Sequence, residues 1–274
     1  MKTIKGDTVK GLTQEQHNNI IIPGTILLGY RGSILHGTYT PKYGSDQRDD
    51  KDLLGVFVAP KEHYIGMSKK EHHIIEEIDS AGIVWDVVTY EIQKFIRLLL
   101  QANPNVMSLL FLPKHMYVVK TESGQKLIDN RDIFVSKRAY KSFSGYANGQ
   151  LHRMTHPSGK HMGKKRRDLV AKFGYDTKNA SCLIMLLRLG IEFLSTGEFV
   201  YPRPDATQLL EIKNGEWSLD KVKKEADKLF DQAREALIHS SIPEKPDFQR
   251  AERLCMDIVE KELSILSKNT QDTE

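Results

Sequence analysis

An acidic triplet, Asp50-Lys51-Asp52, leads directly into an apolar run from Leu53 to Val58, which Ala59-Pro60 stops. The run is typical of a buried β-strand. Residues two apart on a strand project from the same face, so the two carboxylates are expected to converge on one point. Anions held this closely repel each other unless a cation lies between them, and carboxylate oxygens suit Mg²⁺. The triplet therefore predicts either a metal site or an acidic turn at one end of a sheet.

Two neighbouring segments add to this pattern. The run from Thr25 to Tyr30 reads as a short buried strand, and Arg31-Gly32-Ser33 then opens a brief helix through His36. There the glycine permits close approach of the backbone, and the free N–H groups and the serine hydroxyl can hold a phosphate, although an ordinary tight turn has the same sequence. Further on, Asp86 interrupts an apolar strand from Ile83 to Thr89. A carboxylate buried in a strand needs a partner such as a metal ion or an arginine.

The combination resembles the DNA polymerase β-type nucleotidyltransferase superfamily. In that pattern a strand, a Gly-Ser turn on a short helix, an Asp-x-Asp pair on the next strand and a third strand acid follow in order. A closer resemblance is to a bacterial and phage family of predicted nucleotidyltransferases, over residues 24–220. Four segments match its hallmarks: Asp50–Val58, Tyr90-Glu91 through Lys94-Phe95, Asn103-Pro104-Asn105, and Tyr201–Asp205.

The resemblance implies transfer of a nucleoside monophosphate from an NTP to an acceptor hydroxyl, with release of pyrophosphate. The acceptor would be an RNA end, a protein or a small molecule. Two Mg²⁺ ions, or Mn²⁺ in their place, would be held by Asp50 and Asp52, and Asp86 would complete the metal that activates the acceptor oxygen, as ligand or as base. Glu91 is the alternative third acid, although it could simply favour the dipole of the helix it begins. Two acids are next in line for the catalytic pair: Asp46 and Asp49.

The triphosphate needs cationic and N–H partners. By the resemblance, Arg31, Gly32 and Ser33 are the expected nucleotide-binding residues of the first half. In the second half, Lys178 begins a strong helix, and a lysine at a helix N-terminus is costly unless an anion joins it. Lys178 is therefore a predicted triphosphate ligand, which would place the nucleotide in a cleft between the two halves.

Positive charge is concentrated in the middle of the chain. Residues 131–178 contain twelve Lys or Arg against three Asp, a net charge of +9, whereas the whole chain carries +4. Lys164, Lys165, Arg166 and Arg167 are the predicted acceptor-binding patch. Alternatively, Arg166 or Arg167 pairs with Asp168 or Asp176, or the segment is a solvated basic face. A non-catalytic nucleic-acid-binding or regulatory protein that uses this segment is the alternative function.

The organisation changes near residue 120, where strand-like runs give way to helices. We expect an α/β (α+β) nucleotidyltransferase-like domain with a small mixed sheet over residues 1–120, and an all-helical nucleotide- and acceptor-binding domain over residues 121–274. Within the second half, a helix from Lys178 to Thr196 should end at Gly197. Arg188 lies inside that apolar helix and is expected to be paired or to face the cleft.

The remaining features bear on compartment and metals. The two cysteines, Cys182 and Cys255, lie far apart, so a disulfide scaffold is not expected. The longest apolar run stops at Arg188, and residues 1–7 lack the apolar core of a signal peptide, so we expect a cytoplasmic protein without a membrane partner. Three histidines have no cysteine near them in the sequence to complete a zinc site, so zinc is not expected there: His152, His156 and His161.

Overall fold

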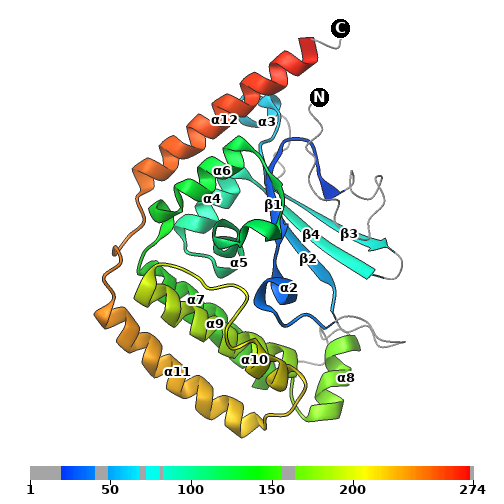
Figure 1. Ribbon diagram of the computed structural model, residues 1–274, viewed down its shortest axis with the longest axis vertical. Helices are drawn as coiled ribbons and strands as arrows, with labels where there is room; N and C mark the ends of the chain where they lie inside the picture. Colours follow the sequence, from blue (N-terminus) through cyan, green and yellow to red (C-terminus); the bar gives the residue numbers. More distant parts are fainter. Residues whose placement is uncertain (1–19, 41–48, 68–71, 81–82, 156–163, 272–274) are drawn as a thin grey trace. The chain divides into compact units, whose positions relative to one another are not determined.

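The computed structural model describes residues 20–40, 49–67, 72–80, 83–155 and 164–271 (Figure 1). Its contacts divide the chain into two compact units. The first contains residues 1–100, 106–134 and 247–274, and the second contains residues 101–105 and 135–246. The expected boundary of folding domains at residue 120 stays a prediction.

A five-stranded mixed sheet forms the centre of the first unit. Its order is β3-β4-β2-β1-β5, with β2 and β4 parallel and the other neighbours antiparallel. This is the small mixed sheet that the sequence predicts. The strands are β1 (Thr25–Tyr30), β2 (Lys51–Phe57), β3 (His73–Ser80), β4 (Ile83–Glu91) and β5 (Tyr117–Lys120).

Apolar side chains on one face of the sheet join four of the strands. Leu28 of β1, Leu53 of β2, Trp85 and Val87 of β4, and Val119 of β5 are buried in one cluster. The alternation of side chains along a strand puts Leu53 and Val87 on one face and their neighbours in the chain on the other. Burying each such side chain stabilises the fold by about 2 kcal/mol. The cluster therefore holds β2 and β4 firmly side by side.

Helices cover one side of this sheet. The helix α4 (Ile92–Leu100) buries Ile92, Phe95 and Leu99 along one face and packs on β2 and β4. The long helix α12 (Phe248–Gln271) packs on α4 and α6 (Figure 1). The shorter helices are α2 (Gly32–His36), α3 (Lys61–Ile65), α5 (Pro104–Met107), α6 (Glu122–Asp129), and the 3₁₀ turns Ser108–Phe111, Lys114–Met116 and Arg131–Phe134.

The second unit is helical, as expected. Its central helix, α9 (Thr177–Thr196), contacts α7 (Arg138–Thr155), α8 (Lys164–Phe173), α10 (Ala206–Lys213) and α11 (Leu219–His239). Gly197 follows α9 with a φ of 72° and donates its N–H to the Phe193 carbonyl, so the predicted helix end is confirmed.

One helix among the described residues, α9, has the length and apolar composition that a membrane span needs. However, 61% of its apolar window is buried inside the protein. The central helix of a soluble helical unit passes the same test of length and composition. The helix α9 is therefore weak evidence for a membrane span.

Candidate active site

The parallel pairing of β2 and β4 brings two predicted acids together. Asp52 on β2 is the register partner of Asp86 on β4. Paired residues on neighbouring strands are about 5 Å apart and project from the same face of the sheet. Asp86 lies between Trp85 and Val87, both buried, but its own side chain is 42% exposed. The expectation of a buried carboxylate at Asp86 was therefore wrong, because its face of the strand is open at this position.

The turn after β1 closes around these acids. The backbone N–H of Arg31 donates to the Asp52 carbonyl at 3.0 Å, and Arg31 Nη2 lies 3.2 Å from Asp86 Oδ2. The sequence predicts either a metal ion or an arginine as the partner of Asp86, and Arg31 is such an arginine. Gly32 has a φ of +63°, and a Cβ atom there would lie 2.2 Å from Asp52 Oδ2. Glycine is therefore required at this position for the Asp52 carboxylate to lie against the turn.

Ser33 is the second residue of α2 and is partly buried. Its carbonyl accepts the N–H of Thr38 at 2.8 Å. Within the described ranges its hydroxyl makes no hydrogen bond, so it has both a donor and acceptor positions for a ligand. Arg31, Gly32, Asp52 and Asp86 thus form one cluster, and Ser33 adjoins it in sequence. We define these five residues as the acidic site.

Asp50 immediately precedes β2 and is partly buried. Burial and the negative charges of Asp49 and Asp50 raise the pKa of Tyr39, so both carboxylates lie near that phenol. The Asp49 carboxylate is buried and accepts the backbone N–H of Thr40 at 2.7 Å. This carboxylate therefore already has a structural hydrogen bond. Asp46, the other alternative acid, lies outside the described residues.

Glu91, the alternative third acid, lies at the other end of β4. Its carboxylate is fully buried and accepts the N–H groups of Gln93 at 3.0 Å and Lys94 at 3.2 Å, in the first turn of α4. It is five residues beyond Asp86 on the same strand, a distance of about 16 Å. The structure therefore places Glu91 at a helix N-terminus, away from the acidic site, and the assignment of Asp86 as third acid stays a prediction.

The predicted cations of the helical half all belong to the second unit. Lys178 is exposed in the first turn of α9, where Asp176 caps the helix by accepting the N–H of Asn179. Arg166 on α8 lies 3.8 Å from Asp176, so the predicted alternative pairing exists, whereas Arg167 is exposed. The side chains of Lys164 and Lys165, and the residues His156 and His161, lie outside the described part. Nucleotide and acceptor binding by these residues stays a prediction.

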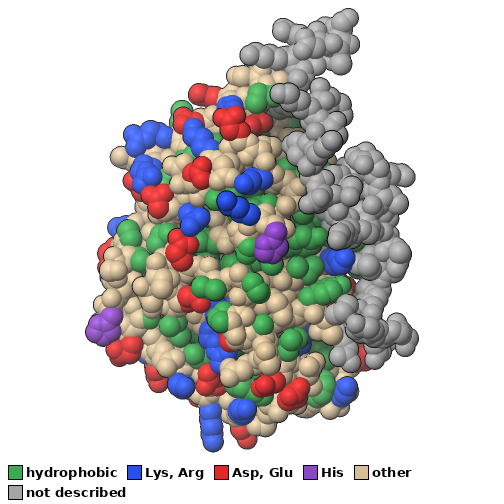
Figure 2. Space-filling model, viewed as in Figure 1, with side chains coloured by type: hydrophobic (Ala, Val, Ile, Leu, Met, Phe, Trp, Pro, Cys, Tyr) green, Lys and Arg blue, Asp and Glu red, His purple; other side chains and the backbone are tan. Residues whose placement is uncertain are grey.

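Figure 2 shows one face of the molecule, on which Lys and Arg side chains are interspersed with Asp and Glu side chains. A single-sign field over a large area is what favours non-specific binding to nucleic acid. The described residues on this face do not form such a field. Any recognition of a polyanion here would depend on particular side chains rather than on overall charge.

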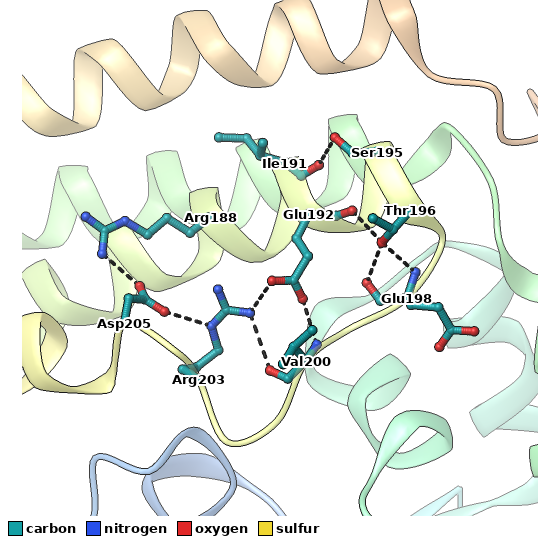
Figure 3. Close-up of polar contacts among 9 residues, drawn as sticks. All are labelled: Arg188, Ile191, Glu192, Ser195, Thr196, Glu198, Val200, Arg203 and Asp205. Carbon is teal, nitrogen blue, oxygen red and sulfur yellow. Dashed lines mark hydrogen bonds and ion pairs between the residues drawn. The ribbon is translucent and has the colours of Figure 1, made fainter.

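A partly buried ion-pair network occupies the hallmark segment Tyr201–Asp205 (Figure 3). Arg203 donates from Nη1 to Glu192 at 2.8 Å and from Nε to Asp205 at 3.0 Å. Arg188 bonds the other oxygen of Asp205 at 2.7 Å and also reaches Glu225 on α11 at 3.1 Å. The prediction that Arg188 is paired is confirmed. In the sequence this segment is recognisable only as a motif. Nothing in the motif indicates that the charged side chains of the segment join the loop to α9 and α11.

Burial raises the pKa of Asp205, but the hydrogen bond from Arg188 and the positive charges of Arg203 and Arg188 outweigh it. The pKa of Asp205 is therefore lower than the ordinary 3.8. The carboxylate stays ionised at neutral pH, which keeps both arginine contacts charge-assisted. The network is a structural feature of the second unit that orients the loop after α9.

A mixed sheet with acids paired across parallel strands, beside a turn that requires glycine, defines a polymerase β-type nucleotidyltransferase fold. The chain belongs to the RNA repair pathway DNA polymerase beta family, RlaP, whose family model matches residues 7–171. The resemblance seen in the sequence is thereby confirmed.

Among solved structures, a nucleotidyltransferase-like protein from Exiguobacterium sibiricum is similar, with 12% sequence identity and a TM-score of 0.30. The match covers 79% of this chain and 69% of that chain. No curated protein matches the sequence.

Proposed function

We propose that this protein transfers a nucleoside monophosphate from an NTP to an RNA end and releases pyrophosphate. Membership of the polymerase beta family supports a nucleotidyltransferase-type enzyme, and the RNA repair description of the family supports RNA as the acceptor. The observation that carries the proposal is the register pairing of Asp52 with Asp86, with Arg31 and Gly32 packed against the pair. A protein or small-molecule hydroxyl is the competing acceptor.

The carboxylates of the acidic site, together with the neighbouring Asp50, fit a divalent cation of the Mg²⁺ class. Asp52 and Asp86 present hard oxygen atoms from adjacent strands, and Asp50 directly precedes Asp52's strand. These three residues would hold the metal ions. When bound, Mg²⁺ or Mn²⁺ would neutralise phosphate charge and lower the pKa of the acceptor hydroxyl.

The protein's own groups would bind and orient the substrates. The guanidinium of Arg31 has five N–H donors, and Nη2 alone contacts Asp86, so further donors remain for phosphate oxygens. The missing side chain of Gly32 lets a phosphate approach the backbone, and the Ser33 hydroxyl can donate to it. Asp86, which is partly exposed, can accept the proton of the attacking hydroxyl. Lys178 and the residues Lys164–Arg167 are proposed to bind the nucleotide and the RNA, respectively.

The test uses the full chain with Mg²⁺, each α-labelled NTP, and RNA oligonucleotides that differ in their terminal groups. Transfer of label to one kind of RNA end is the expected result. Asp52→Asn should lower the transfer rate by about 100-fold or more, since it removes a metal ligand. Asp129→Asn is the matched control, because Asp129 is exposed on α6 and accepts only from Gln125 among the described contacts.

Transfer to protein or to small hydroxyl compounds alone would reject RNA as acceptor. RNA binding without pyrophosphate release would favour the non-catalytic alternative.

A further inference from the structure

Two histidines and a glutamate meet in the first unit, away from the acidic site. His63 on α3, His72 directly before β3, and Glu91 at the end of β4 each offer one ligand atom, and these atoms lie within 4.8 Å of one another. Because Glu91 is five residues beyond Asp86 on the same strand, this cluster lies about 16 Å from the acidic pair. We call His63, His72 and Glu91 the His-His-Glu cluster.

Backbone contacts hold the cluster together from three separate elements. The N–H of Glu91 donates to the carbonyl of His72 at 3.0 Å, which fixes the two residues side by side. The N–H of His63 donates to the Pro60 carbonyl at 2.9 Å and holds His63 in the first turn of α3. The two imidazole rings are perpendicular, with centroids 6.0 Å apart. The cluster is therefore positioned by the fold itself.

Glu91 is a buried carboxylate that lacks a cationic partner among the described residues. Its Oε1 accepts the hydroxyl of Tyr64 at 2.9 Å, and its Oε2 accepts the N–H groups of Gln93 and Lys94. These neutral donors and the partial charge of a helix N-terminus offset only part of the cost of burying a full negative charge. A cation beside Glu91 would offset the rest of the cost of burying this negative charge.

The two imidazoles have ligand atoms to spare. Neither ring makes a hydrogen bond within the described ranges, so each neutral ring keeps one nitrogen lone pair for a ligand. His63 is buried and His72 is exposed, which gives the cluster one side open to solvent. Two imidazoles and one carboxylate are a usual donor set for Zn²⁺ with three protein ligands.

We propose that His63, His72 and Glu91 bind one divalent transition-metal ion of the Zn²⁺ class, with water in the fourth position. Ligand atoms around tetrahedral Zn²⁺ are about 3.4 Å apart, so the cluster needs side-chain movements on the order of 1 Å to enclose the ion. The Tyr64 hydroxyl and the two N–H groups of α4 orient the carboxylate, as partners of metal ligands commonly do. The ion would attach α3 and the start of the edge strand β3 to the end of β4.

Calorimetric titration of Zn²⁺ into metal-free full-length protein tests the proposal. We expect one Zn²⁺ per chain in a site that His72→Ala and His63→Gln each weaken by at least about tenfold. Because His72 is exposed, its replacement leaves the fold intact even if the His63 variant does not fold. His73→Ala is the matched control, since His73 is exposed next to His72 and, among the described residues, its ring contacts that of Tyr90 alone. Asp52→Asn should also leave this affinity unchanged.

A second readout is the melting temperature, which Zn²⁺ should raise in the wild-type protein and in His73→Ala but not in His72→Ala. Substitution with Co²⁺ should give the visible absorption of a tetrahedral complex. Zn²⁺ affinity that is the same in the wild type, His72→Ala and His63→Gln would overturn the proposal. Loss of the site in Asp52→Asn alone would assign the ion to the acidic site instead, and would likewise overturn it.

Discussion

At the scale of single residues, the contact between Gly32 and Asp52 determines whether the acidic site can form. Gly32 combines a positive φ with an oxygen atom where a Cβ would lie. An alanine there would be strained in its backbone and would displace the Asp52 carboxylate. The position therefore links the local conformation of the turn directly to the placement of a predicted metal ligand.

We expect Gly32→Ala to lower the free energy of unfolding by about 1–2 kcal/mol, which is the cost of the left-handed conformation for a residue with a Cβ. The same substitution should abolish nucleotidyl transfer, because it displaces the Asp52 carboxylate. Gly145→Ala is the control, because Gly145 lies in α7 and a Cβ there would meet no atom within 4 Å. Urea denaturation and the transfer assay measure the two effects. A Gly32→Ala protein as stable and active as the wild type would contradict this account of the turn.

The two cysteines are a second test at the residue scale. Burial, and then the charge of Glu91, raise the pKa of Cys255 to about 11, and burial raises the pKa of Cys182. Only about one Cys255 in a thousand is then ionised at pH 8, and the thiolate is the form that reacts. We expect slow alkylation of both thiols by iodoacetamide in the folded protein and fast alkylation in urea, followed by mass spectrometry. Rapid labelling of Cys255 in the native protein would contradict the raised pKa of its thiol.

At the scale of secondary-structure elements, the sequence predicts those with strong patterns. The strand β1, the amphipathic helix α4 and the glycine-terminated α9 lie where their apolar spacing and end signals place them. The strands β3 and β5 were missed for physical reasons. The edge strand β3 carries charged residues that weaken the alternation, as edge strands often do, and β5 has only four residues.

The ion-pair network between α9, α11 and the loop after α9 makes a prediction about pH. Because the folded-state pKa of Asp205 is lowered, the unfolded chain takes up its proton first as the pH falls. Stability from this carboxylate is fully present above its ordinary pKa of 3.8, and it is lost as the pH falls below that value toward the folded-state pKa. We expect Asp205→Asn to reduce the loss of stability between about pH 5 and pH 3.

Chemical denaturation at a series of pH values, with the fluorescence of Trp85 and Trp217 as the probe, measures this effect. Asp220→Asn is the control, since Asp220 is exposed in the first turn of α11. The wild type and the control should show the same slope of stability against pH, and Asp205→Asn a shallower one. Equal slopes in all three proteins would mean that the network does not hold Asp205 ionised.

At the scale of the whole molecule, sequence reasoning found the acids but not how the fold arranges them. The strand patterns placed Asp52 and Asp86 on strands, yet their direct pairing depends on β2 and β4 being parallel neighbours. The association of α12 with the first unit is a contact across the length of the chain, which local periodicity cannot reveal. The His-His-Glu cluster has no sequence signal either, since its members are nine and nineteen residues apart and meet only in the fold.

The central claim is that the acids paired across β2 and β4 catalyse nucleotidyl transfer. The most direct test counts the pyrophosphate released for each labelled nucleotide joined to RNA, in the wild type and in Asp86→Asn. We expect equal amounts of both products in the wild type. We expect background levels of both in Asp86→Asn, with a melting temperature close to that of the wild type because Asp86 is partly exposed. Transfer at the wild-type rate in Asp86→Asn would contradict the account.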